Sequence, residues 1–364
     1  QAKIMKLVNL SYLDPYWELS NLQLSDMNLI VAKNATGKTR TLLTIDLLVK
    51  MITQKKNLNW GSRWTVDFVN HQNQSISFEF ATKYQDEGIV TAEKISIDGK
   101  QVLFRHHKQG TVVLKNFVTQ KEDTIYPPNN KLTLHVNRDV RKYPYLEDLI
   151  NWAEQCYGFK FGNISPYSKF SEQEYDLLTA VEDIPNLFKS LQKESIAKII
   201  SDFNSLGYNV SEISSKDLPY TVLYVKESQL NKALPHYKLS QGMFRTLAIL
   251  VYIEYLTIRK KPAMVIIDDF CEGLDYDRAR KLGKLVFEKC KNTAIQLVVT
   301  SNDSFLMDTI DIQYWNILQR NGKVITCLNQ QNSPNVFKKF RLTGLSNFDL
   351  FSSDFLLQTP NETK

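Results

Sequence analysis

The sequence predicts an α/β fold whose core is assembled from both ends of the chain, with an antiparallel sheet and a helical segment between them. Compact apolar runs at 27–32, 263–268 and 295–300 have the pattern of buried strands, and helical spacing follows the first two. Short alternating runs occupy residues 64 to 134, and helical spacing returns between 145 and 206. Strands and helices that alternate at both ends indicate a sheet flanked by helices.

These changes of pattern divide the chain into five segments. Its 364 residues exceed what one hydrophobic core usually supports, about 250–300 residues, so a division is expected. The segments are the N-terminal lobe of the core (1–63), an antiparallel β subdomain (64–134), a helical insertion (135–215), the C-terminal lobe of the core (216–330) and a C-terminal tail (331–364).

The composition excludes several classes of protein. With 43% hydrophobic and 23% charged residues the chain is globular, and its four widely spaced cysteines do not form a zinc motif. Its apolar runs are too short to cross a bilayer, and its first residues do not resemble a signal peptide, so we expect a cytoplasmic protein without a membrane partner. The net charge of +6 permits a nucleic-acid partner without requiring one.

A phosphate-binding loop is predicted between the strand at 27–32 and the helix that follows. Residues 32–39 (AKNATGKT) match the pattern G-x-x-x-x-G-K-[ST] except at the first position, where Ala32 replaces glycine and must keep a negative φ. Backbone N–H groups of such a loop bind phosphates, Lys38 would reach the β- and γ-phosphates, and Thr39 would bind Mg²⁺. The residues expected to bind ATP here are Asn34, Ala35, Thr36, Gly37, Lys38, Thr39 and Arg40.

Two further motifs lie in the C-terminal lobe. The strand at 263–268 ends in Asp268, followed by Asp269, at the edge where open α/β sheets bind ligands. One carboxylate can hold Mg²⁺ while the other polarises a water molecule; alternatively, both only begin a helix, where Asp is a favoured cap. Ser240 is the expected N-cap of a helix at 243–258.

These motifs resemble those of ABC-type ATPases, within the soluble RecF and SMC-like branch and its OLD-like relatives in prokaryotic anti-phage defence. Residues 239–242 (LSQG) are similar to the LSGGQ signature, and residues 268–275 (DDFCEGLD) match the run D-E-x-x-x-x-L-D in register. The resemblance implies a P-loop NTPase core of ABC type, in which a mixed sheet has flanking helices. It also implies ATP and Mg²⁺ as cofactors.

The resemblance assigns roles to individual residues. Asp268 and Thr39 would hold Mg²⁺, and the catalytic residues would be Asp269, Lys38 and Asn302, the last in place of a switch histidine. Two subunits would pair head to tail in a homodimer or higher oligomer. In that pair the residues of one subunit that meet the ATP of the other would be Ser240, Gln241, Gly242 and Asp275.

Two departures from the family pattern favour slow hydrolysis. Asp269 is one methylene shorter than the usual glutamate, which moves its oxygen by ~1.5 Å, and such a shift can cost ~10²-fold in rate. Asn302 cannot carry the positive charge of a histidine.

An aromatic residue to stack on adenine is sought among Tyr12, Tyr16 and Trp17, for which a core role is equally open. The Q-loop residue is sought in HVNRD (135–139), at Asn137.

The expected function is that of a nucleotide-dependent switch. The stretch between Lys38 and Ser240 lacks sustained heptads, which argues against a long coiled coil. The stretch after Asn302 is too short for a Toprim nuclease, so we expect a separate effector, a nuclease or toxin, most plausibly in anti-phage defence. The alternatives are a RecF-like DNA clamp in repair and a non-hydrolysing nucleotide-sensing scaffold. The apolar tail at 337–357 would pack on its own core or dock a partner.

Overall fold

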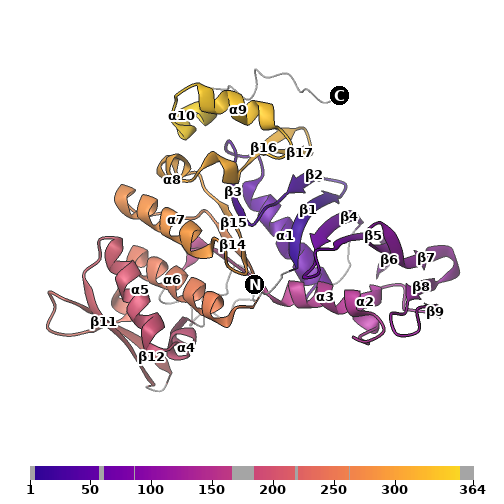
Figure 1. Cartoon of the computed structure of the whole chain (residues 1–364), viewed down its shortest axis with the longest axis horizontal. Coiled ribbons are helices and arrows are strands. Elements are labelled where there is room, and N and C mark those ends of the chain that lie inside the picture. The colour runs from indigo at the N-terminus through magenta and orange to yellow at the C-terminus, as the bar shows by residue number, and fades with distance from the viewer. Residues whose placement is uncertain are drawn as a thin grey trace.

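The computed structural model describes residues 5–56, 61–85, 87–165, 184–217, 220–261 and 263–352. These residues form one long mixed sheet with helices on both faces, and a small second sheet at one end (Figure 1). In spatial order, the long sheet contains β10 (Cys156–Lys160), β14 (Ala263–Asp268), β15 (Ile295–Thr300), β3 (Met27–Val31), β16 (Trp315–Asn321), β17 (Val324–Leu328), β2 (Glu18–Gln23), β1 (Lys6–Leu13), β4 (Ser62–Val69), β5 (Ser75–Gln85), β6 (Glu87–Ile97), β7 (Lys100–His106), β8 (Thr111–Lys115) and β9 (Glu122–Ile125).

The long sheet is parallel at one end and antiparallel at the other. Strands β10, β14, β15, β3 and β16 are parallel neighbours, whereas β4 to β9 pair as successive antiparallel strands. Strand β1 joins the two parts, because it pairs with β2 and, through positions such as Leu10 opposite Val66, with β4. The predicted mixed sheet with flanking helices is confirmed, and the antiparallel strands expected at 64–134 continue it.

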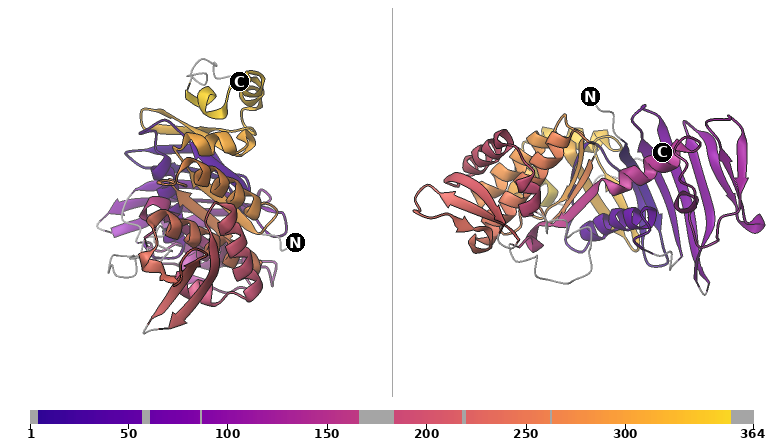
Figure 2. Two further views of the ribbon diagram at one scale, coloured as in Figure 1. Left: turned by 90° about the vertical axis from the view of Figure 1, so that its left-hand side faces the viewer. Right: turned by 90° about the horizontal axis from the view of Figure 1, so that it is seen from below.

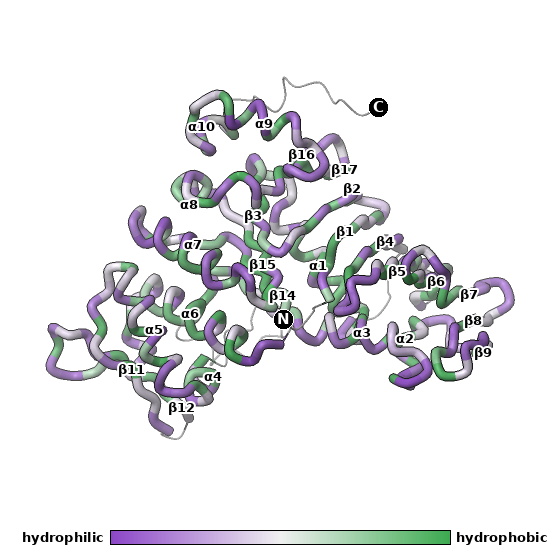
Figure 3. Tube along the Cα trace, in the orientation of Figure 1, coloured by the Kyte–Doolittle hydropathy of each residue, from purple (hydrophilic) through white to green (hydrophobic). Residues whose placement is uncertain are grey.

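Helices cover both faces of the parallel strands. Met264 and Ile266 of β14 pack in one core with α1 (Lys38–Ile52) and α3 (Pro144–Glu154). Val265 and Ile267 pack in a second core with α6 (Gln241–Arg259) and α7 (Tyr276–Cys290). Successive side chains of a strand point to opposite faces, so an apolar run without alternation fits a strand buried on both sides. Figure 3 shows this concentration of hydrophobic residues at the centre of the molecule.

The segment expected to be a helical insertion contributes strands as well as helices. Its helices are α2 (Thr133–Val136), α3, α4 (Ile184–Lys189) and α5 (Lys193–Ser205). Strand β10 leaves this segment to pair with β14, and β11 (Val210–Asp217) forms a separate sheet with β12 (Thr221–Glu227) and β13 (Leu234–Pro235). This small sheet and strands β7 to β9 lie at opposite ends of the molecule (Figure 2).

The last described helices pack on the C-terminal lobe. They are α8 (Ser304–Thr309), α9 (Pro334–Leu342) and α10 (Asn347–Ser352). Phe337, Phe340 and Phe351 are buried in the core, whereas Leu342 and Leu345 are exposed. The aromatic part of the tail thus packs on its own chain, and residues 353–357 lie outside the described residues. Within the described ranges, no helix is both long and apolar enough to cross a membrane.

A buried ion pair connects α2 to the antiparallel end of the sheet. Arg105 on β7 donates to Glu93 on β6 at 2.9 and 3.1 Å, and both side chains are almost fully buried. Glu93 also accepts from the backbone N–H and the hydroxyl of Thr133 at 2.8 Å, and Arg105 donates to the carbonyl of Lys131 at 2.7 Å. Burial raises the pKa of Glu93, while the charge of Arg105 opposes that rise.

Replacing Arg105 with leucine should destabilise the protein, because the carboxyl group of Glu93 would lose its buried counter-charge. We expect the free energy of unfolding in urea to fall by about 3–5 kcal/mol. The control is Lys94→Ala, which removes an exposed ion pair with Glu79 (3.1 Å) and should change stability by no more than about 1 kcal/mol. Equal effects of the two substitutions would contradict the assigned role of the buried pair.

Candidate functional site

The predicted phosphate loop lies between β3 and α1, at the carboxyl end of the parallel strands. Gly37 caps α1 with a φ of +117°, in a region that side chains other than glycine rarely adopt. A Cβ atom there would lie 3.4 Å from Ile325 and 3.7 Å from Trp17. These are ordinary contact distances, so it is the backbone geometry that requires glycine at this position.

The loop tolerates alanine at its first position. Ala32 is not among the residues with positive φ, as the sequence-based expectation required; Ala35 has a φ of 61° instead. For a residue with a Cβ atom this conformation costs roughly 1–2 kcal/mol. Arg320, at the end of β16, donates to the carbonyl of Ala35 at 3.2 Å and so supports the strained turn from outside.

Lys38 points back into the loop. Its ammonium group donates to the carbonyl of Ala32 at 2.9 Å, and the side chain is buried. Burial lowers the pKa of Lys38, and the charges of Asp269 and Asp268 oppose this effect. The carboxylates of Asp269 and Asp268 are therefore close enough to Lys38 for their charges to act on it. Thr39 and Arg40 follow in the exposed first turn of α1.

Asp268 is fully buried at the end of β14. One of its carboxylate oxygens accepts a hydrogen bond from the Thr300 hydroxyl, at the end of the neighbouring strand β15. The other oxygen, Oδ2, has no hydrogen-bond partner among the described residues. Buried polar atoms are nearly always paired, so an unpaired carboxylate oxygen beside a phosphate loop fits a Mg²⁺ site.

Asp269 begins the turn after β14 with a φ of 50°. Its backbone N–H donates to the Thr300 hydroxyl at 2.9 Å, and its carboxylate lies 3.5 Å from the ammonium group of Lys160. Lys160 ends β10 and is paired in register with Asp268. The side chain of Asp269 is 24% exposed, so a ligand can reach it.

The sequence did not predict Lys160 or Thr300 as site residues. Lys160 was missed because no strand was predicted between residues 145 and 206, where the run CYGFK forms β10. Thr300 ends a predicted buried strand, as Asp268 does, and this shared position at a strand end was the signal that could have identified it. The Q-loop residue was sought at Asn137, which is the C-cap of α2. Helix α2 lies close to the antiparallel strands and away from β14 (Figure 1).

The signature segment caps α6 as predicted. Ser240 is the N-cap, and its hydroxyl accepts from the backbone N–H of Met243 at 3.2 Å. Ser240 and Gln241 are exposed. A Cβ atom on Gly242 would lie 3.2 Å from Leu274, so the small residue lets α6 approach the turn after β14. That turn ends at Asp275, the exposed N-cap of α7, which accepts from the backbone of Arg278 at 3.1 Å.

The remaining predicted residues occupy different surroundings. Asn302, after β15, is exposed, just before Asp303 caps α8. Tyr12 and Trp17 are buried core residues, and the guanidinium group of Arg40 lies 5.2 Å from the Trp17 ring. Tyr16, in contrast, is 81% exposed. Of the three aromatic residues considered for adenine, only Tyr16 has a free ring face.

Arg245 connects three parts of the site. From the second turn of α6 it donates to the carbonyls of Gly162 and Ile164, after β10, and to the carbonyl of Glu272, after β14. It also donates to the side chain of Gln241 in the signature segment at 3.2 Å. A single guanidinium group thus holds together the segment after Lys160, the turn after Asp269 and the start of α6.

Replacing Arg245 with lysine should loosen this connection, because an ammonium group cannot reach several carbonyls in different directions. We expect amide hydrogen exchange in residues 161–165 to accelerate roughly tenfold or more, as measured by mass spectrometry. Arg259→Lys is the control, since Arg259 lies at the other end of the same helix. Unchanged exchange in 161–165 would contradict the role assigned to Arg245.

Comparison with known proteins identifies the fold. No protein-family model and no curated protein matches the sequence. An Smc head bound to the C-winged helix domain of ScpA has a TM-score of 0.55 and 13% identity, over 90% of this chain and 99% of that one. An Smc head with an extended coiled coil, bound to the C-terminal domain of ScpA and derived from Pyrococcus furiosus, has a TM-score of 0.51 and 11% identity, over 93% and 100%. The chain therefore shares the fold of Smc head domains.

Proposed function

We propose that the protein is an ABC-type ATPase that binds ATP with Mg²⁺ and hydrolyses it slowly at a head-to-tail dimer interface. The observation that carries this proposal is the convergence of Lys38, Asp268 and Asp269 at one edge of the sheet. The unpaired oxygen of buried Asp268 supports a cation there. Lysine, a metal-binding carboxylate and a second carboxylate are the groups that phosphoryl transfer to water requires.

Each part of the site has a distinct role in this proposal. Backbone N–H groups of residues 34–40 and the ammonium group of Lys38 bind the phosphates. Thr39 and Asp268 would hold Mg²⁺, which would neutralise charge on the phosphates. Asp269 orients the attacking water and accepts its proton, and the amide of Asn302 donates a hydrogen bond to the γ-phosphate.

Slow turnover follows from the side chains at positions 269 and 302. The carboxylate of Asp269 is one methylene shorter than that of the usual glutamate, so it reaches less far toward an attacking water molecule. Asn302 offers a neutral donor where an imidazolium would offer a charge. An enzyme with these features suits a switch whose state persists between hydrolysis events.

Exposed groups beside the site support pairing of two subunits. Ser240 and Gln241 begin a helix of 19 residues, whose positive N-terminal end would face the γ-phosphate of a partner subunit. Tyr276 and Phe305 are 48% and 41% exposed, and their rings pack edge to face with centroids 4.4 Å apart. An exposed aromatic pair beside a polar motif is typical of a surface that becomes covered.

The biological setting rests on the sequence resemblance alone. The similarity to OLD-like proteins supports a role as a sensor that switches a separate nuclease or toxin in bacterial anti-phage defence. A RecF-like DNA clamp and a non-hydrolysing scaffold are the competing functions, and ATP turnover measured with and without DNA separates them.

ATP turnover by wild type, Lys38→Ala and Asp269→Asn tests the proposed function. We expect weak turnover by the wild type and a loss of at least about 10²-fold in each variant, because Lys38→Ala removes the positive charge at the reacting phosphate and Asp269→Asn removes the group that accepts the proton of the attacking water. Light scattering should detect an ATP-dependent dimer of the Asp269→Asn variant, which can bind ATP without hydrolysing it.

Other outcomes would identify the alternatives. Turnover retained by Lys38→Ala would place the activity outside this site. Turnover that double-stranded DNA stimulates in a salt-sensitive manner would favour the clamp. ATP-dependent assembly without turnover would favour the scaffold.

Replacing Lys160 with glutamine should lower turnover, because Lys160 offsets negative charge at the site. We expect a decrease on the order of tenfold in kcat/KM, since a charge beside the transferred phosphoryl group acts mainly on the transition state. The control is Lys189→Gln, which should leave kcat/KM unchanged. Lys189 is an exposed lysine that pairs with Asp217 and is not one of the site residues. Faster turnover by Lys160→Gln would mean that Lys160 restrains Asp269 instead.

A further inference from the structure

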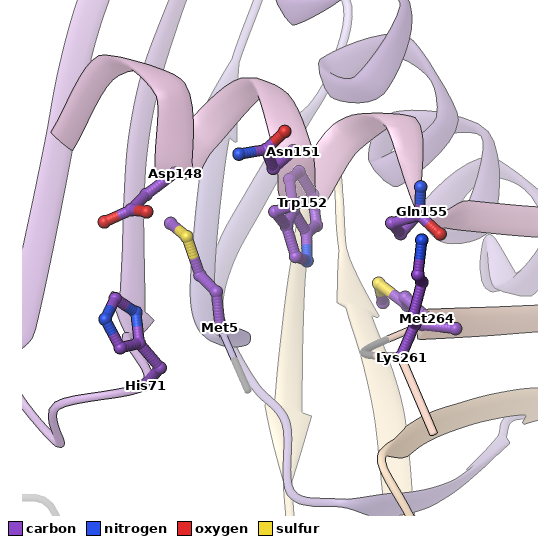
Figure 4. A pocket seen from close by; sticks show the side chains of 9 residues that line it. Met5, His71, Asp148, Asn151, Trp152, Gln155, Lys261 and Met264 are labelled. Atoms are coloured by element: carbon purple, nitrogen blue, oxygen red, sulfur yellow. The ribbon is translucent and has the colours of Figure 1, made fainter. Parts of the chain in front are cut away.

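A cavity of about 310 Å³ lies at the opposite end of β14 from the ATP site (Figure 4). Strand β14 begins at Ala263 and Met264, which line the cavity, and ends at Asp268. Helix α3 forms one wall through Asp148, Trp152 and neighbouring residues. The volume is within the range of small-ligand sites, and neither the proposed ATPase chemistry nor the proposed dimer uses this cavity.

The lining combines apolar side chains with polar groups on two sides. The apolar part is formed by Met5, Met264 and the buried ring of Trp152. Figure 4 shows Asp148 and His71 together on one side and Lys261 beside Gln155 on the other. The cavity thus offers negative charge on one side and positive charge on the other, together with apolar surface.

Trp152 provides a second and independent indication of a ligand. The residue is 5% exposed, and its indole Nε1 has no hydrogen-bond partner among the described residues. Figure 4 shows this nitrogen directed into the space between Met5 and Met264. Buried indole N–H groups normally donate to an acceptor. A ligand in the cavity could supply the acceptor that Trp152 lacks among the described residues.

The spacing of the charged ends limits the size of the ligand. Asp148 and Gln155 are seven residues apart, which is about 10 Å along a helix. The two charges of a single α-amino acid are too close together to meet both ends. An extended tripeptide spans about 10 Å and carries carbonyl acceptors along its length.

We propose that this cavity binds a short apolar peptide of about three residues with free termini. Its terminal ammonium group pairs with Asp148, and its carboxylate pairs with Lys261. A central carbonyl accepts from Trp152 Nε1, and the side chains contact Met5 and Met264. Burial raises the pKa of Asp148, and the charge of His71 opposes this rise. A buried carboxylate is poorly solvated, so a cationic group that pairs with it would favour its charged form.

The indole signals of the full chain, labelled with ¹⁵N at its five tryptophans, provide the test. Trp152→Phe assigns the Trp152 signal. The probes are Ala-Leu-Ala, its N-acetylated form and its C-terminal amide, each titrated to about 10 mM. We expect the free tripeptide to shift the Trp152 signal saturably, and each capped form to bind at least about tenfold more weakly, because each lacks one terminal charge.

Variants of the two charged ends complete the experiment. Asp148→Asn should remove the preference for the free tripeptide over its N-acetylated form. Lys261→Gln should remove the preference for the free tripeptide over its C-terminal amide. Glu154→Gln, on the exposed side of α3, is the matched control and should bind like the wild type. No shift of the Trp152 signal, equal binding of all three peptides, or preferences that survive both substitutions would overturn the proposal. The readout does not depend on ATP turnover, so a failure of the proposed ATPase function would leave it intact.

Discussion

The parallel register of β14 between β10 and β15 is the constraint on which the candidate site depends. Because the three strands run in the same direction, their carboxyl ends bring Lys160, Asp268 and Thr300 to one edge. A shift of β14 by one residue would move every side chain of the strand to the opposite face. Asp268 would then lose its contact with Thr300, and the apolar side chains of the strand would exchange places between the two cores that flank the sheet.

Backbone strain gathers at this edge, and cations hold it in place. Ala35, Asp269 and Cys271 all have positive φ in the turns that follow β3 and β14. Strained residues of this kind persist where the surrounding contacts determine their conformation. Here those contacts are made by Lys38, Arg320 and Arg245, which donate to backbone carbonyls of the same turns or of the segments beside them. The carbonyl contacts pre-organise the phosphate loop and the turn after Asp268 before any ligand arrives.

The two ends of β14 offer different chemistry because strand ends differ in what surrounds them. At the carboxyl end, loops leave charged side chains and unpaired polar atoms that suit a phosphate and a cation. At the amino end, α3 and the start of β1 enclose apolar surface with charges only at the rim. One six-residue strand therefore connects a polar edge to an amphipathic cavity.

The sequence alone determined the features that depend on local pattern. Apolar runs predicted β3, β14 and β15, helical spacing predicted α1, α6 and α7, and short motifs located the phosphate loop, Asp268 and the Ser240 cap. These predictions succeeded because strand period, helix period and capping act over a few neighbouring residues. They placed most of the proposed ATP site on the correct elements.

Only the tertiary structure decided which distant residues complete that site. Lys160 reaches it because a five-residue strand, too short to be distinguished from its helical surroundings, pairs with β14. Arg245 and Arg320 contribute through bonds to backbone carbonyls far away in the sequence, and such bonds leave no periodic trace. The continuity of the long sheet likewise depends on β1 pairing with β4. Long-range pairing is set by burial and register in three dimensions, so no local pattern in the sequence encodes it.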